Sequence, residues 1–279
     1  MRKEPLIKRI IISFVVMAFA LLSLFPFYWM IVNSFKLPND IFKQPVDIIP
    51  IRVTFESYLA IFTKNNGELW RAFSNSLIIS LSFTIGTVFT SSLAAYAFSK
   101  IKFKGRNGLY FCFIATLLIP GQVTLLPLYA VFAKIGWTDT VLPLIIPGIL
   151  INTYGVFMLR QFMVSVPNEL LEAAEMDGCG YFRKFFNIML PLCVPALITL
   201  ALFSFIGSWN NYFGQLIYLN PNKTPTIALF IAGLKEQHAN GSQWGQIMAA
   251  TTISIIPISI VYLASQKYFV QGIATTGIK

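Results

Sequence analysis

Charged residues are scarce in this chain, at 11% of its 279 residues, against the roughly one quarter of a typical soluble domain. The single histidine, His238, excludes a histidine-based metal site and a Ser/His/Asp triad. Three scattered cysteines, at positions 112, 179 and 193, are too few for a disulfide framework. The phosphate-loop pattern G-x-x-x-x-G-K-S/T is also missing. We therefore expect no catalytic residues, metal or cofactor, and any ATP used must be bound by another chain.

Apolar residues dominate instead, at 56%, and the mean hydropathy is +0.69. This composition predicts an all-α polytopic membrane protein. Uncharged stretches long enough to span a bilayer, which takes about 20 residues, predict six transmembrane helices. They run over residues 10–35, 72–99, 108–133, 141–159, 191–219 and 247–265. The net charge of +10 does not indicate nucleic-acid binding, because the basic residues flank these apolar stretches.

The basic residues also predict the orientation. With both termini and the two basic connections in the cytoplasm, 13 of the 21 Lys and Arg residues are cytoplasmic. Five of the other eight lie in the long first external loop, where acidic residues nearly balance them. None of the six stretches contains Asp, Glu, Lys, Arg or His, which disfavours a proton-driven carrier. The chain after residue 265 is expected to be a cytoplasmic tail, residues 266–279.

The only cluster of acidic residues lies between the fourth and fifth stretches, in a loop at residues 165–190. The pattern from Pro167 to Asp177 predicts a short helix, in which Leu171, Ala174 and Gly178 form a smooth strip. Gly178 and Gly180 suit a left-handed turn before a second helix, residues 181–190. A strip of small residues on such an elbow would let another protein approach closely.

Here the sequence resembles a known family. Glu172-Ala173-Ala174, Asp177-Gly178 and Ile188, Leu190 and Pro191 are similar to the EAA loop of bacterial ABC importer permeases. In that family the loop is the coupling helix that docks on the cytoplasmic ATPase, so the resemblance assigns coupling to Glu172, Ala173, Ala174, Asp177 and Gly178. The alternative is an ordinary interfacial amphipathic helix. One position departs from the family pattern: Cys179 stands where Ala is common.

The resemblance covers essentially the whole chain and is closest to the smaller membrane subunit of maltose-type systems. Further matching stretches are Asn33 to Lys36, Asn75 to Leu77, Ala95 to Phe98, Phe103 to Arg106, Ile119 to Gln122, Pro127 to Tyr129, Trp209-Asn210, and Gln266 to Lys279. It implies a single type I importer permease domain over residues 1–279 in the bacterial cytoplasmic membrane. It also implies a second, homologous permease, two ATPase subunits and an extracytoplasmic solute-binding protein, which the external stretch 220–246 is expected to contact. The tail, residues 272–279, is expected to reach between the ATPase subunits.

Polar and aromatic residues inside the stretches are candidates for a sugar path. Trp209, Asn210, Asn211 and Tyr212 could stack on and hydrogen-bond to a sugar, or could serve as an interfacial belt and a helix contact. Gln122 and Asn152, the latter with Tyr154, could line the path or join helices. Prolines 120, 127, 143, 147, 195 and 257 are expected to bend helices.

The predicted function is therefore the permease of an ATP-driven, binding-protein-dependent importer of a sugar or oligosaccharide. One alternative is the same architecture serving a polyol or a glycerol phosphate. A phosphate cargo would favour a basic residue along the path, and no stretch offers one. The other alternative is a stand-alone secondary carrier, which the acidic loop and the uncharged stretches disfavour.

Overall fold

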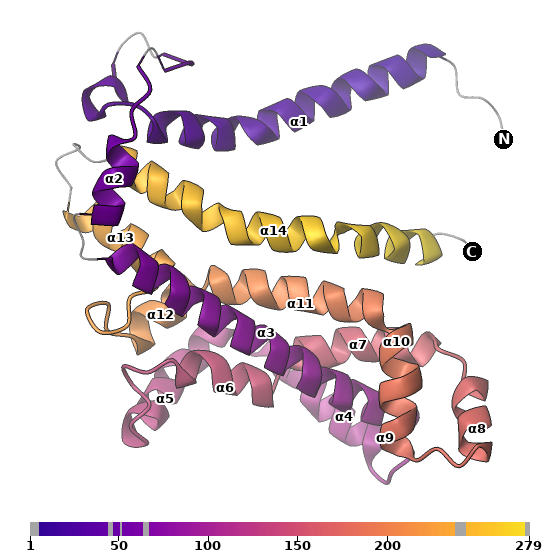
Figure 1. The fold of residues 1–279 in the computed structure, drawn as a ribbon. Coiled ribbons are helices and arrows are strands. Elements are labelled where there is room, and N and C mark those ends of the chain that lie inside the picture. Colours follow the sequence, from indigo (N-terminus) through magenta and orange to yellow (C-terminus); the bar gives the residue numbers. More distant parts are fainter. Residues whose placement is uncertain (1–5, 44–46, 51, 64–66, 238–243, 277–279) are drawn as a thin grey trace. The chain divides into compact units, whose positions relative to one another are not determined.

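The computed structural model describes residues 6–43, 47–50, 52–63, 67–237 and 244–276, with side chains up to residue 268. All regular elements within these ranges are helical (Figure 1). The α-helices are α1 Leu6–Ser34, α2 Glu56–Thr63, α3 Glu68–Lys100, α4 Arg106–Ala115, α5 Gly121–Lys134, α6 Leu142–Leu150, α7 Thr153–Ser165, α8 Glu169–Met176, α9 Tyr181–Lys184, α10 Leu190–Leu192, α11 Val194–Trp209, α12 Tyr212–Tyr218, α13 Ile227–Gln237 and α14 Trp244–Thr276. Short 3₁₀ turns occupy Pro38–Asp40 and Thr116–Leu118, and a π-helical turn occupies Phe185–Met189.

By length and composition, four helical segments of the described chain could cross a membrane. They are Leu6–Ser34, Glu68–Lys100, Leu142–Ser165 and Trp244–Tyr268. Two bent pairs raise the number to as many as six: Arg106–Leu118 with Gly121–Lys134, bent by 99°, and Tyr181–Leu192 with Val194–Trp209, bent by 79°. Each of the six predicted stretches overlaps one of these segments or pairs.

The chain divides into two compact units, which we describe separately. The first contains residues 1–70 and 230–256. In this unit Asn33 and Ser34, at the end of α1, and Lys36, just after it, are all buried. The Ser34 hydroxyl lies 2.9 Å from the Tyr58 hydroxyl of α2, and the Phe35 ring packs on that of Tyr58. These contacts explain why a polar segment directly after an apolar helix is folded inward.

The second unit contains residues 71–229 and 257–279 and has two apolar cores. One core gathers residues from α3, α7, the loop around α8, and the start of α11, including Ala95, Leu159, Leu171, Phe185 and Leu200. The other lies where α3, α5, α6 and α12 meet, with Ile79, Phe132, Ile145 and Tyr218 as buried members. The helices in this unit therefore pack on one another through apolar side chains at both ends of α3.

Some element boundaries differ from the sequence prediction. The fourth stretch was expected to end at Leu159, but α7 continues to Ser165 and includes Arg160, whose Nε donates to the Phe98 carbonyl. The fifth stretch was expected to run to residue 219, but α11 ends at Trp209 and α12 is separate. The expected tail begins inside α14, which continues through Pro257 and Gly272 to Thr276. Residues 277–279 lie outside the described ranges.

Candidate functional site: a coupling loop and a cavity at two broken helices

The acidic loop folds into the predicted pair of short helices. Helix α8 ends in a left-handed residue, Gly178, with φ of 76°. The Gly178 amide donates to the Glu175 carbonyl and the Cys179 amide donates to the Ala174 carbonyl, which is the Schellman pattern of a glycine-terminated helix. Gly180 is extended, with φ of −72° and ψ of 171°. The left-handed turn therefore depends on Gly178 alone, and the expectation for Gly180 is wrong.

One face of α8 packs on the chain's own core. Leu171 and Ala174 are buried, and Leu171 belongs to the core that also contains Phe185 and Met189. The sequence suggested that Leu171, Ala174 and Gly178 form a strip for contact with another protein. Two of these three residues, Leu171 and Ala174, instead pack within the chain itself. Ala174 is buried within the chain itself, where its small side chain lets α8 lie close to the body of the second unit; its predicted role in coupling stays a prediction.

An ion pair between Lys184 and Glu175 joins the two short helices of the loop. The Lys184 ammonium lies 2.9 Å from the Glu175 carboxylate, and the Lys184 side chain is only 7% exposed while that of Glu175 is 70% exposed. The hydrogen bond that the Lys184 ammonium donates to the Glu175 carboxylate raises the pKa of Lys184 in this loop. The lysine therefore stays charged at neutral pH and ties the two short helices together across the glycine turn.

The opposite face of the loop is open. Glu172, Ala173, Asp177 and Gly178 are exposed, as is Met176, whose side chain is 88% exposed. A large apolar side chain this accessible outside the apolar spans is a typical contact residue for a partner surface. Helical spacing places Met176 on another face than Leu171, and sequence reasoning missed it because it considered only the strip of Leu171, Ala174 and Gly178.

The span formed by α6 and α7 is broken at residues 151–152. The break leaves backbone groups without helical partners, and nearby side chains satisfy them, as a membrane interior requires. The Asn152 Oδ1 atom accepts from the Gly155 amide at 2.6 Å, which caps α7. On the other side of the break, the hydroxyls of Thr87 and Thr90 on α3 donate to the carbonyls of Gly148 and Ile149.

A second break separates α11 from α12, and an asparagine caps the second half again. The Asn211 Oδ1 atom accepts from the Gly214 amide at 3.0 Å. Both asparagines face one cavity of about 290 Å³ in the second unit. Its lining residues are Phe83, Leu144, Asn152, Tyr154, Leu200, Phe203, Ser204, Gly207, Ser208 and Asn211. Discontinuous helices that meet at a polar cavity are the usual setting of a transporter's substrate site.

Some of the predicted path residues line the cavity and others do not. Trp209 does not line the cavity: it is 1% exposed, with its ring stacked on Phe205 and edge-on to Phe73, so its place in a sugar path stays a prediction. Asn210 is exposed beside the break but does not line the cavity. Gln122 is exposed on α5, and Tyr212 packs on the second core, so neither lines it. The apolar run around Trp209 favours burial of a large ring over exposure to a polar path.

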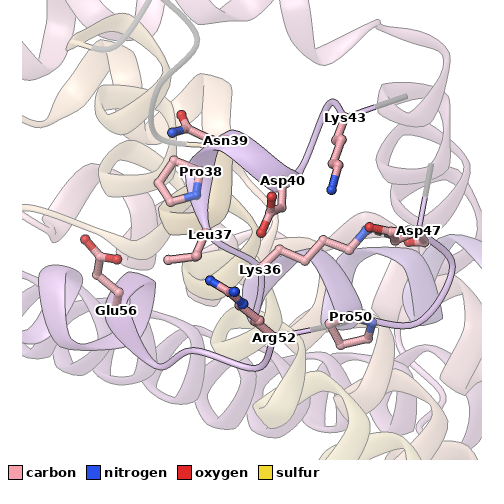
Figure 2. Close-up of a pocket in the computed structure, with 10 residues that line it drawn as sticks. All are labelled: Lys36, Leu37, Pro38, Asn39, Asp40, Lys43, Asp47, Pro50, Arg52 and Glu56. Atoms are coloured by element: carbon pink, nitrogen blue, oxygen red, sulfur yellow. Dashed lines mark hydrogen bonds between the residues drawn. The ribbon is translucent and has the colours of Figure 1, made fainter. Parts of the chain in front are cut away.

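A larger polar cavity, of about 670 Å³, lies in the first unit along residues 36–56. Figure 2 shows charged side chains of both signs around it, with Lys36 extended toward Asp47. The Lys36 ammonium donates to the Asp47 carbonyl at 2.7 Å and lies 4.7 Å from the centre of the Trp29 ring. Lys36 is thus held as a structural cation, and the mixed charges around it favour no single ligand.

Comparison with known proteins identifies the family. The family described as binding-protein-dependent transport system inner membrane component matches residues 86–275. The chain is 33% identical over 279 residues to the trehalose/maltose transport system permease protein MalG of Thermococcus litoralis, covering 99% of each. It is 31% identical over 274 residues to the arabinooligosaccharides transport system permease protein AraQ of Bacillus subtilis, covering 97% of this chain and 96% of AraQ. It is 32% identical over 257 residues to the sn-glycerol-3-phosphate transport system permease protein UgpE of Salmonella choleraesuis, covering 90% of each.

The fold is also found among solved structures. A chain in the crystal structure of a bacterial ABC transporter involved in the import of the acidic polysaccharide alginate matches with a TM-score of 0.81 at 22% identity, covering 96% of this chain and all of that chain. The predicted fold, an all-α membrane permease of the ABC importer type, is thereby confirmed. With a family match over most of its length and relatives more than 30% identical along nearly all of it, this chain belongs to the inner membrane components of binding-protein-dependent transport systems.

Proposed function

We propose that this chain is one of two membrane permeases of an ATP-driven importer that takes up a sugar or oligosaccharide delivered by a solute-binding protein. Its relatives are named as permeases for trehalose/maltose and for arabinooligosaccharides. The observation that carries the proposal is the pair of features in the second unit: an exposed acidic helix at one loop and, between two broken helices, an uncharged cavity lined by amide, hydroxyl and aromatic groups among apolar side chains. One suits coupling to an ATPase and the other suits a neutral, hydroxyl-rich cargo.

The exposed face of α8 is the proposed contact with the ATPase. Glu172 and Asp177 supply polar contacts, while Ala173 and Gly178 permit close approach. Met176 adds an apolar anchor that the sequence did not suggest. Closure of the ATPase dimer on ATP would pull α8 and rock the path between inward-open and outward-open states. The ATPase activity then belongs to a separate subunit, and this chain itself is not an enzyme.

The cavity is the proposed section of the sugar path in this chain. Asn152 and Asn211 offer amide groups, Ser204 and Ser208 offer hydroxyls, and Tyr154 offers an aromatic face. Such a combination suits the hydroxyls and the apolar face of a sugar ring. At about 290 Å³ the cavity is at the lower end of ligand-site volumes, so we expect the partner permease to complete it.

A glycerol phosphate is the second candidate cargo, since one relative of comparable identity is named as a permease for sn-glycerol-3-phosphate. None of the ten residues that line the cavity is charged. A dianionic phosphate group that moved from water into this cavity would find no cationic partner there, and such a transfer is costly in a low-dielectric site. We therefore favour the neutral sugar. Competition for uptake by a phosphate-bearing solute, stronger than by neutral sugars, would reverse this preference.

The orientation follows from the charge distribution along the sequence. We place both termini and the loop around α8 on the cytoplasmic side of a bacterial inner membrane, with the segments at 36–71 and 220–246 outside. The external segments are the proposed contacts with the solute-binding protein. Residues 238–243 of this region lie outside the described ranges.

The test is co-purification in mild detergent from the native host, with an affinity tag at the amino terminus and wild type beside Gly178→Asp. Gly136→Asp is the matched control, because both glycines are exposed, have left-handed φ values of 76° and 73°, and leave open space for a Cβ atom. Backbone strain is therefore similar in the two variants. Only Gly178 lies on the proposed contact face.

We expect an ATPase and a second permease to co-purify with wild type and with Gly136→Asp. The ATPase should be lost, and sugar uptake abolished, in Gly178→Asp. Retention of the ATPase and of uptake in Gly178→Asp would refute the contact role of this loop. Solute uptake that persists in cells lacking every candidate ATPase partner would instead indicate a stand-alone carrier.

A further inference from the structure

Lys100 is the last residue of α3 and lies where three elements meet. Its ammonium donates to the backbone carbonyl of Val166 at 2.6 Å and to the Asn168 Oδ1 atom at 2.8 Å. Val166 follows the last residue of α7, and Asn168 precedes the first residue of α8. One side chain thus joins the end of α3, the end of α7 and the start of the coupling helix.

The chemistry of lysine suits such a junction. An ammonium carries three donors and no acceptor, so it can bind several oxygen atoms at once. A positive charge at the carboxyl end of a helix also meets the negative end of the helix dipole, which here is the end of α7. Val166 itself is buried in the first core of this unit, so its carbonyl is held in place. Packing therefore fixes the position of the Val166 carbonyl, and the hydrogen bond to this carbonyl positions the Lys100 ammonium.

Both helices joined at Lys100 reach the cavity. Phe83, on the cavity wall, lies in α3 seventeen residues before Lys100, or about 26 Å along an unbroken helix without proline. Asn152 and Tyr154 lie at the other end of α7. A second tie, from Arg160 of α7 to the Phe98 carbonyl, joins the same two helices near Lys100. A displacement of α8 at Asn168 would thus act on two helices that both contribute residues to the cavity wall.

We propose that Lys100 is the positioning residue that transmits motion of the coupling helix to the cavity walls. This inference rests on the proposed function. The neighbouring basic residue Lys102 is exposed and has the ordinary role of a cytoplasmic-side cation. Lys100 differs because its charge is directed into the chain, onto the two segments that flank the start of α8.

The experiment follows the cavity with a chemical probe, so that the identity of the sugar does not matter. In the assembled importer, the three native cysteines are replaced by alanine and Phe203→Cys places a thiol on the exposed cavity wall. The rate of maleimide labelling is measured without nucleotide and with ATP and vanadate. Lys100→Met, Lys100→Arg, Asn168→Ala and the control Lys102→Met are compared with the parent.

We expect the parent and Lys102→Met to show the same large change of labelling rate on adding ATP and vanadate. Lys100→Met should keep its ATPase subunits but lose most of this change, at least about tenfold, as for the loss of a charge-assisted hydrogen bond. Lys100→Arg should restore it, because the guanidinium can still donate to both oxygens. An unaltered change in Lys100→Met would overturn the proposal.

Asn168→Ala keeps the result interpretable where Lys100→Met fails to assemble. It removes only the contact to the start of α8 and leaves the contact between α3 and α7. A reduced labelling change in an assembled Asn168→Ala importer supports transmission through Lys100, and an unreduced change overturns it. The proposed function fails separately, when the parent itself binds no ATPase or shows no nucleotide-dependent labelling.

Discussion

Asn152 combines a folding role with the transport role proposed for it, and two substitutions should separate them. Its Oδ1 atom caps α7 by accepting from the Gly155 amide at 2.6 Å, and the same side chain lines the cavity. Asn152→Ser keeps a capping oxygen but loses the amide that faces a substrate. Asn152→Ala loses both. A serine at this position can accept from the same amide group, since serine is among the preferred helix caps.

The magnitudes follow from the environment of the break. Loss of a helix cap costs about 0.5–2 kcal/mol, and we expect the upper end because a bilayer offers the freed amide little water. With each kcal/mol shifting the thermal midpoint by about 2–4 °C in a chain approaching this size, Asn152→Ala should melt about 4–8 °C below wild type. Asn152→Ser should melt within about 2 °C of it. Both should lower sugar uptake about fivefold, as for one neutral hydrogen bond of about 1 kcal/mol.

The assays are thermal unfolding in detergent, followed by tryptophan fluorescence, and initial uptake rates in cells with matched expression. Asn210→Ala is the control, because Asn210 is exposed beside the second break and does not line the cavity. It should change neither measurement. A serine variant as unstable as the alanine variant would refute the capping argument. A serine variant with wild-type uptake would refute the contact with substrate.

Three other predictions concern contacts that hold the chain together. Replacing Thr87 and Thr90 together by valine should cost about 2 kcal/mol of stability, because the carbonyls of the broken span lose their donors; an unchanged melting midpoint would contradict this. Lys184→Met should leave α8 folded but speed limited proteolysis of the loop several-fold, which mass spectrometry would locate. Lys36→Met should cost about 2 kcal/mol, whereas exposed Lys43→Met should cost less than about 0.5; equal effects would refute the buried-cation argument.

The pair of short helices in the loop around α8 was predictable because its signals are local. Proline before a helix, helical spacing of Leu171 and Ala174, and glycine after the last turn each act within a few residues, and the structure follows them. The sequence could not show which face of α8 packs on the chain's own core and which is exposed. The same strip of small residues serves a partner or the chain's own core, and only the position of the surrounding helices decides that Leu171 and Ala174 point inward.

The helix breaks show a different limit. The prolines correctly indicated irregularity near residue 120 and around residue 193, where the helix pairs bend. Yet Pro127 and Pro257 lie inside continuous helices, and the two breaks that form the cavity occur at Asn152 and Asn211. A proline bends a helix through its own ring, which is visible in the sequence. An asparagine caps a break only where other side chains, here those of Thr87 and Thr90, satisfy the carbonyls on the other side.

Helix α3 also carries a row of hydroxyl side chains along one side, despite lying in an apolar stretch. Ser76, Ser80, Thr84, Thr87 and Ser91 are all buried in the second unit, and they follow one another at helical spacing. Small hydroxyl side chains let helices approach closely: a Cβ atom at Gly148 would overlap the Phe83 ring, and one at Gly155 would contact the Ser91 hydroxyl. Helix α3 thus supports the broken span through Thr87 and Thr90 and holds Lys100 at its carboxyl end. In the proposed mechanism, one unbroken helix therefore both maintains the cavity and responds to the loop around α8.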